Sequence, residues 1–170
     1  RTALAHGLKA KIHTDEIDAI GGTELAGMLP AISAEHLIAA TDRGILALAQ
    51  GGTVASCFRR RRFIWENLCQ GPGHDCGRRT GICGSDYNPG SCPSLNLQLV
   101  MNLACWNYGM SPEEVLTAVT LNAAAAICRA DRLGSLEVGK QADLVIWDAP
   151  NLSLFLPIWS KSGQNGDQTR

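Results

Sequence analysis

Four residues that can bind a metal or move a proton follow short apolar runs along this chain. His13 ends the alternating run LKAKIH, and Glu16 lies three residues beyond it. His36 stands in the apolar run AEHLIAA, and Asp86 follows the run TGIC. Imidazole nitrogens and carboxylate oxygens are the usual ligands of zinc or iron, and a metal with an open coordination position activates water near neutral pH. The pattern indicates a metal-dependent hydrolytic site in which Glu16 can transfer protons.

Each of these residues also has a purely structural explanation. A histidine in a buried strand is commonly a core side chain with its hydrogen bonds satisfied. Asp86 precedes YNPGS, and Asp, Asn, Pro and Gly favour turns for backbone reasons. The combination is what favours a site, because His13, His36 and Asp86 each lie at or near a predicted strand end and Glu16 follows His13 closely.

The elements that must position these residues alternate between strand-like and helix-like patterns. Strand-like runs cover residues 8–13, 34–40, 51–55 and 80–86, and helical patterns follow the first two at 23–29 and 41–50. Such alternation predicts parallel βα units, in which the carboxyl ends of the strands converge on one active site.

The second half of the chain is predicted to be mostly helical. One helix is expected within residues 95–109. Another is expected over 111–127, with Ser111 as N-cap, Pro112 in the first turn and Glu114 completing a capping box. Residues 134–150, GSLEVGKQADLVIWDAP, contain two short β-like runs around a Gly-Lys turn. The architecture is therefore expected to change there from βα units to a small β element.

Composition excludes several classes of partner. The 170 residues carry a formal net charge of −1, so bulk charge implies neither nucleic acid nor an anionic membrane, and a small molecule is the expected partner. We find no signal peptide and no apolar run of about 18 residues, and we expect a cytoplasmic protein. The seven cysteines include no CxxC pair and are expected to be ordinary thiols rather than zinc ligands or disulfides.

Four segments resemble the imidazolonepropionase family of amidohydrolases. They are KIHTDEIDAIGGTELA, SAEHLIAATDRGILALAQGGTVA, the long segment from SDYNPGSCPSLNLQLVM to LNAAAA, and GSLEVGKQADLVIWDAP. The resemblance implies an α/β fold: the C-terminal half of a metal-dependent-hydrolase (β/α)8 barrel over residues 1–132, and part of a small β-sandwich domain over 133–170. It also implies hydrolysis of 4-imidazolone-5-propanoate to N-formimino-L-glutamate in histidine degradation, and a homodimeric full-length enzyme.

The same resemblance assigns roles to the residues. It makes His13 and Asp86 ligands of one Zn²⁺ or iron ion, with Asp86 also counted among the catalytic residues. Glu16 would contact the substrate and transfer its proton, and His36 would orient the attacking water. The positions that match substrate-holding residues of the family, besides Glu16, are Asn88, Gly90 and Ser91.

The chain departs from this family in one respect that bears on activity. The family carries two further metal ligands as a His-x-His pair, whereas no two of the four histidines here are separated by one residue. Two alternatives therefore remain beside the hydrolase. One is a catalytically inactive fragment or pseudogene product. The other is a hydrolase of another cyclic amide or amidine.

Residues 56–79, SCFRRRRFIWENLCQGPGHDCGRR, fit neither the family nor their surroundings. Their arginines could form a phosphate-binding patch, and the His-Asp-Cys run at 74–76 could bind a metal. We interpret the segment, together with Gly84 and the tail after about residue 155, as the result of reading-frame errors, because shifted codons recover family-like text. The segment is then expected to be irregular.

Overall fold

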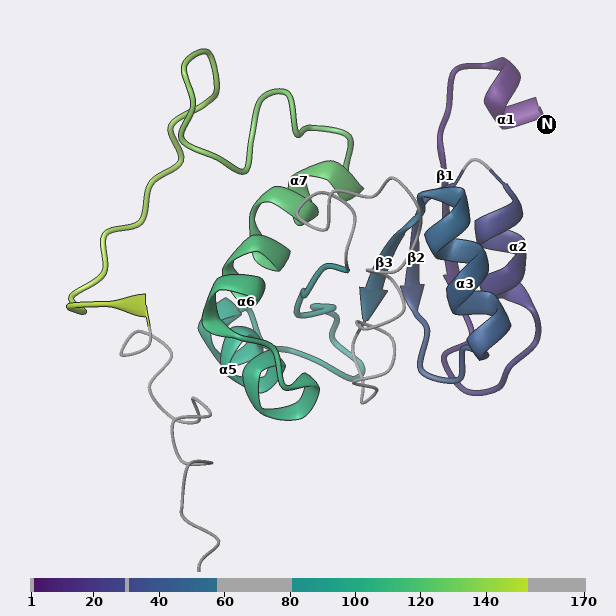
Figure 1. Cartoon of the computed structure of the whole chain (residues 1–170), viewed down its shortest axis with the longest axis horizontal. Coiled ribbons are helices and arrows are strands. Elements are labelled where there is room, and N and C mark those ends of the chain that lie inside the picture. Colours follow the sequence, from purple (N-terminus) through teal and green to yellow (C-terminus); the bar gives the residue numbers. More distant parts are fainter. Residues whose placement is uncertain (1, 30, 58–80, 153–170) are drawn as a thin grey trace, which may run out of the picture.

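The computed structural model describes residues 2–29, 31–57 and 81–152 (Figure 1). The elements in chain order are α1 Thr2–Ala5, β1 Ala10–Thr14, α2 Gly22–Met28, β2 Ala31–His36, α3 Asp42–Gly51, β3 Val54–Cys57, α5 Leu97–Tyr108, α6 Pro112–Val119 and α7 Leu121–Ala126. The basic run and the tail that we interpret as frame errors lie almost wholly outside the described residues. No helix in the described ranges is long and apolar enough to cross a membrane.

The three strands form a parallel sheet in the order β1-β2-β3, so the predicted βα pattern is confirmed for this part of the chain. Helices α2 and α3 cover one face of the sheet (Figure 1). They bury an apolar core against it, made of Ala26, Ala34, Leu37, Ala40, Ile45, Leu48, Ala49 and Ala55. Two wound βα units thus fix the strands on which His13 and His36 lie.

Glycines let α2 and α3 approach backbone to backbone. A Cβ added at Gly27 would lie 2.3 Å from the carbonyl carbon of Ala47, and one added at Gly51 would lie 2.2 Å from the Gly27 oxygen. Neither position can hold a larger residue without separating the helices.

The second strand ends earlier than its apolar pattern predicts. The run AEHLIAA was expected to be extended throughout, but β2 stops at His36 because His36 and Leu37 have left-handed φ values of 74° and 57°. The strand expected over 80–86 is reduced in the described part to one bridge, in which the Ile82 N–H donates to the Ala55 oxygen at 2.8 Å.

In the helical half, the predicted capping box at the start of α6 is formed. Ser111 caps α6: the Glu114 N–H donates to Ser111 Oγ at 3.2 Å, and the Ser111 N–H donates to Glu114 Oε2 at 2.7 Å. The single helix expected over 111–127 is divided in two at Thr120, whose φ of −119° and ψ of −85° are not helical. A second apolar core joins Cys83 to α5 and α6 through Met101, Ala104, Met110, Val115 and Ala118.

The expected β element near the end of the chain is not formed. Residues 134–150 contain no strand, and Val138 and Ile146 are fully exposed. Extended segments need a hydrogen-bonded neighbour to be stable, and none lies beside this segment in the described part of the chain. The sandwich domain therefore remains a prediction.

The thiol of Cys83 is expected to be unreactive in the folded chain. Burial, with a smaller contribution from Cys105, raises the pKa of Cys83 to about 12, so roughly one thiol in ten thousand is ionised at pH 8. Cys128 is partly exposed and is the matched control. Alkylation with iodoacetamide, followed by peptide mass spectrometry, should label Cys128 at least about 100-fold faster. Equal rates would show that the core around Cys83 opens readily.

Candidate metal centre

Two histidines lie at the carboxyl ends of neighbouring strands. His13 is the second-last residue of β1, and His36 is the last residue of β2. Because β1 and β2 are parallel, their carboxyl ends lie side by side at one end of the sheet, where Thr14 pairs with His36. The loop after β1 carries Glu16 to this end. The structure therefore places both histidines at strand ends, and the loop brings Glu16 beside them.

The three side chains form a compact cluster. His13 Nε2 lies 3.1 Å from one oxygen of Glu16, and His36 Nδ1 lies 3.8 Å from the other. The two imidazole rings are tilted by 55°, with their centroids 4.2 Å apart. One donor atom from each residue lies within 4.8 Å of the other two. His36 is buried whereas His13 and Glu16 are exposed, so the cluster opens to solvent on one side.

Strained backbone holds the cluster in place. Left-handed φ values at non-glycine residues are uncommon, and they occur here at Asp15, His36 and Leu37. Two hydrogen bonds join the loops that carry them: the Leu37 N–H donates to the Thr14 oxygen at 3.2 Å, and the Ala39 N–H donates to the Asp15 oxygen at 2.7 Å. The loops after β1 and β2 are therefore tied to each other by backbone hydrogen bonds.

Asp15 is a site residue that the sequence analysis missed. The residue is 3% exposed, and its carboxylate accepts hydrogen bonds from the Ile20 N–H at 3.1 Å, from the Thr23 N–H at 3.0 Å and from both Thr14 and Thr23 hydroxyls. Burial raises the pKa of Asp15, but these hydrogen bonds, led by those from Thr23, outweigh it and leave the pKa below its ordinary value. Asp15 fixes the loop between His13 and α2. No periodic pattern in the sequence reports these hydrogen bonds.

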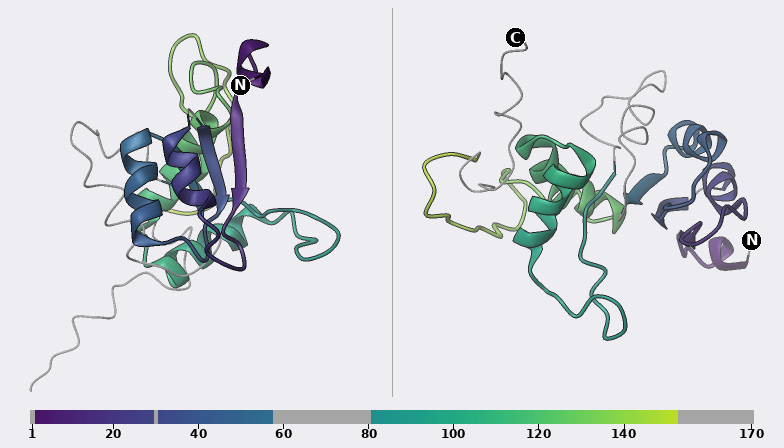
Figure 2. Two further views of the ribbon diagram at one scale, coloured as in Figure 1. Left: turned by 90° about the vertical axis from the view of Figure 1, so that its right-hand side faces the viewer. Right: turned by 90° about the horizontal axis from the view of Figure 1, so that it is seen from below.

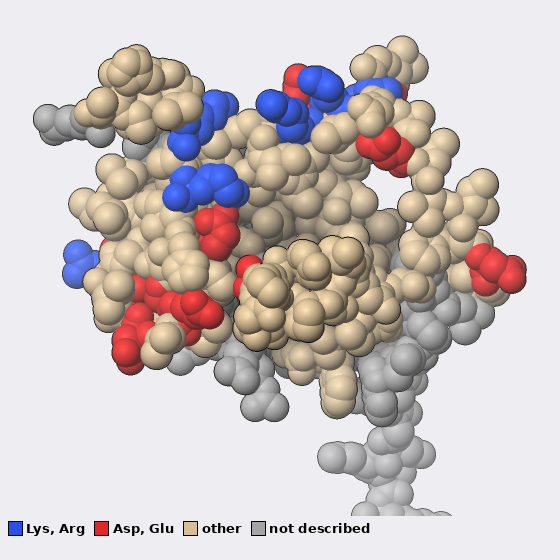
Figure 3. Space-filling model, turned by 180° about the vertical axis from the view of Figure 1, so that it is seen from behind, with Lys and Arg blue, Asp and Glu red and all other residues tan. Residues whose placement is uncertain are grey.

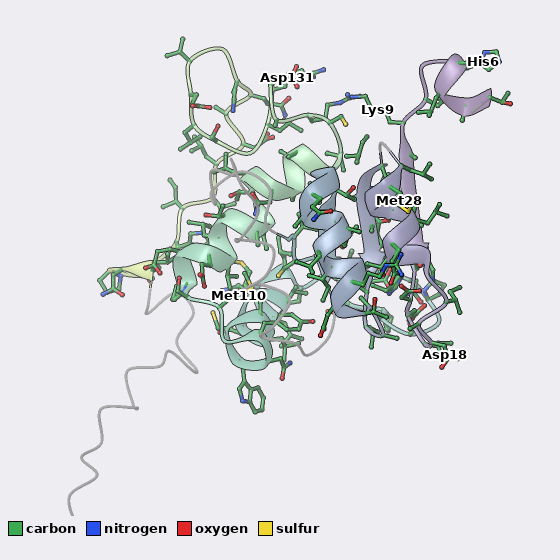
Figure 4. The ribbon with its side chains drawn as sticks, turned by 45° about the vertical axis from the view of Figure 1, so that its right-hand side comes forward. His6, Lys9, Asp18, Met28, Met110 and Asp131 are labelled. Atoms are coloured by element: carbon green, nitrogen blue, oxygen red, sulfur yellow. The ribbon has the colours of Figure 1, made fainter. Side chains whose placement is uncertain are left out.

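Replacing Asp15 by asparagine is expected to destabilise the chain by about 2 kcal/mol or more. The amide cannot accept every hydrogen bond that the carboxylate accepts, and bonds to a charged group each contribute about 1.5–3 kcal/mol. Asp18→Asn is the control, since Asp18 lies exposed in the same loop (Figure 4). Urea unfolding of the two variants measures the difference. Equal midpoints would show that Asp15 does not hold the loop.

The loop that carries Asp86 lies apart from this cluster. Asp86 is exposed, has a φ of 50°, and is absent from the group of donor atoms that converge in the described part of the chain. Figure 2 shows its loop, residues 84–96, extending away from the sheet. The predicted convergence of His13, His36 and Asp86 thus holds here for the two histidines.

Asn88 organises the Asp86 loop from within. Its side-chain oxygen accepts from the Gly90 N–H at 2.9 Å and from the Ser91 N–H at 2.7 Å, and its amide donates to the Asp86 oxygen at 2.7 Å. The three residues predicted to hold substrate, Asn88, Gly90 and Ser91, therefore form one tight turn. Their role in binding substrate stays a prediction.

The donor set of the cluster suits zinc or iron. Two imidazoles and a carboxylate match the ligands of mononuclear zinc sites and of non-haem iron sites. Calcium and magnesium, in contrast, prefer all-oxygen environments. The chemistry of the cluster therefore fits the metal that the sequence predicted, without distinguishing between zinc and iron.

A protein with such histidines at the carboxyl ends of parallel strands has the arrangement of a metal-dependent βα hydrolase. A model of the amidohydrolase family matches residues 73–170. The match covers more than half of the chain, and the chain belongs to the amidohydrolase family.

Curated relatives are more specific. The chain is 48% identical to the imidazolonepropionase of Alkaliphilus oremlandii over 155 residues. The aligned region covers 88% of this chain and 36% of the relative. The chain is 46% identical over 157 residues to the imidazolonepropionase of Fusobacterium nucleatum, covering 88% and 37%, and 46% identical over 159 residues to that of Treponema denticola, covering 92% and 38%. The chain thus spans little more than a third of the length of the curated relatives it matches.

Proposed function

We propose that this chain belongs to an imidazolonepropionase, which hydrolyses 4-imidazolone-5-propanoate to N-formimino-L-glutamate. The observation that carries the proposal is the convergence of Glu16 with His13 and His36 at one end of the sheet. The similarity to imidazolonepropionases, at 44–48% identity, supports the choice of substrate. A cyclic amide is also a substrate for which activated water and a nearby proton carrier suffice.

We assign His13 as a metal ligand, with Asp86 as a second ligand when its loop approaches the sheet. The turn built by Asn88 fixes the backbone directly after Asp86. A bound zinc or iron ion would act as a Lewis acid and activate water. We assign to His36, which is buried beside His13, the role of orienting that water.

Glu16 is the proton carrier in this proposal. Its two oxygens lie 3.1 Å and 3.8 Å from the two imidazoles, so the carboxylate reaches the space between both rings. Glu16 accepts a proton as the water oxygen bonds to the imidazolone carbonyl carbon. It then gives that proton to the ring nitrogen as the carbon–nitrogen bond breaks. The carbonyl carbon becomes a carboxyl group, and the carbon between the two ring nitrogens, together with the released nitrogen, becomes the formimino group.

A graft tests the proposal. Residues 10–57, which carry the sheet and the cluster, replace the corresponding segment of the Alkaliphilus oremlandii relative. We expect the graft to open the imidazolone ring, measured by the loss of imidazolone absorbance and by mass spectrometry of the product. A hydantoin and a cyclic amidine are assayed in parallel.

Each outcome of the graft experiment has a distinct meaning. Preference for imidazolonepropanoate supports the proposed substrate, whereas preference for the hydantoin or the amidine supports another cyclic amide or amidine hydrolase. A folded graft that binds metal and opens none of the three rings would contradict the proposal and support a catalytically inactive chain.

A further inference from the structure

The strands that carry the two histidines are paired in a shifted register. Ala10 pairs with Ala31, but the next residue, Lys11, pairs with Ser33, so Ile32 is an extra residue in β2. From there the pairing continues regularly, with His13 opposite Glu35 and Thr14 opposite His36. An extra residue of this kind changes which side chains face each other along the rest of a strand pair. The register at the metal centre is therefore set just after Ile32.

A polar network stands immediately after the shift. Lys11 Nζ lies 2.9 Å from a carboxylate oxygen of Glu35 and also donates to Ser33 Oγ, whose hydroxyl donates to the same Glu35 oxygen. Ser33 is fully buried. The network joins β1 to β2 on the face that α2 and α3 leave open, where basic side chains lie above acidic ones over the sheet (Figure 3).

The network is also anchored to the helical half. Lys11 Nζ donates to the Ala126 oxygen at 3.2 Å, and Ala126 is the last residue of α7. The carbonyl groups at a helix end have no partner within the helix, so a cation there is favourable. Lys11 thus ties two strands and one helix end at a single point.

A slip of one residue would dismantle the metal centre. If β2 paired without the extra residue, His13 would face Ala34, and His36 would lie one position further along β1. Because side chains alternate between faces, Ser33 and Glu35 would turn toward the apolar core in which Ala34 now lies. Burying an unpaired carboxylate among apolar side chains is costly, so the polar network opposes the slip.

We propose that Lys11, Ser33 and Glu35 act as positioning residues that lock the β1–β2 register and so hold His13 beside His36. The effect of this lock on metal binding rests on the proposed function. The register itself does not, because it can be measured without metal. Lys11 and Glu35 do not belong to the donor cluster. They act through the backbone of the strands.

Cross-strand nuclear Overhauser effects in the isotopically labelled 170-residue chain measure the register directly. The variants are Lys11→Met, Glu35→Gln and the conservative Lys11→Arg. Lys9→Met is the matched control, because the Lys9 amine meets the Cys128 sulfur at 3.4 Å and takes no part in the network (Figure 4). Cobalt titration of each variant, followed by absorbance, reports the geometry and affinity of the cluster.

In the native chain and in Lys9→Met we expect cross-strand contacts of the observed register, between Lys11 and Ser33 and between Ile12 and Ala34. Lys11→Met and Glu35→Gln should lose these contacts or show a second set from the slipped register, and their cobalt affinity should fall about 10–100-fold, as when outer partners of metal ligands are removed. Lys11→Arg should keep the register. If Lys11→Met fails to fold, the cross-strand contacts in Glu35→Gln alone decide whether the network holds the register.

Unchanged cross-strand contacts in both Lys11→Met and Glu35→Gln would overturn the lock, whatever happens to cobalt affinity. A native chain that binds no cobalt would count against the proposed metal site, while the cross-strand contacts would still decide the lock. The two proposals can therefore fail separately.

Discussion

Replacing Glu16 by glutamine in the grafted enzyme is expected to lower the rate of ring opening by about 10²–10⁴-fold. Glutamine keeps the size of Glu16 and can still accept a hydrogen bond, but it cannot take a proton from water and return it to the ring nitrogen. Metal content should stay unchanged, because His13 remains. Steady-state rates and metal analysis of the same preparation measure both effects.

Asp18→Asn is the control for Glu16→Gln. Asp18 is an exposed acidic residue of the same loop and is not part of the donor cluster. Its replacement should leave the rate of ring opening within about twofold of that of the unsubstituted graft, as expected for a surface change. Full activity in Glu16→Gln, or loss of metal along with activity, would mean that the proton carrier has been assigned wrongly.

Replacing His13 by alanine is expected to remove metal binding from the 170-residue chain. His13 is one of the two ligands that we assign, and without it only the Asp86 carboxylate of that pair remains. The loss should exceed the 10–100-fold typical for residues that only support a ligand. Equilibrium dialysis with zinc, followed by metal analysis, measures the affinity.

His6→Ala provides the matched control for His13→Ala. His6 is exposed beyond the amino end of β1, far from the loop that carries Asp18 (Figure 4). Zinc affinity should be unchanged when it is replaced. Equal affinities of the His13→Ala and His6→Ala variants would show that the chain binds zinc elsewhere or only weakly and nonspecifically.

Local signals explain why much of the fold was predictable. The first two βα units were recognised because alternating and helical periods follow each other at short spacing, and the start of α6 because Ser111 and Glu114 form a capping box. The meeting of His13 and His36 followed from one geometric rule, namely that carboxyl ends of adjacent parallel strands share an edge.

The features that escaped prediction depend on backbone conformations and side-chain contacts that hydrophobic periodicity does not report. The role of Asp15 arises from hydrogen bonds that reach Ile20 and Thr23, and no local pattern reports them. The β-like runs within 134–150 have the right alternation but lie beside no strand in the described residues, so pattern alone predicted too much. The end of β2 was missed because the left-handed conformation of His36 breaks an otherwise apolar run.

An anomalous-scattering map of zinc-loaded crystals of this chain tests the central claim most directly, because it locates the metal independently of activity. The account predicts a peak at the carboxyl ends of β1 and β2, with an imidazole nitrogen of His13 about 2.0–2.1 Å from the ion. Approach of the Asp86 carboxylate to the same ion would further support its assignment as a ligand. A peak held by other residues, or an empty cluster at saturating zinc, would contradict the account.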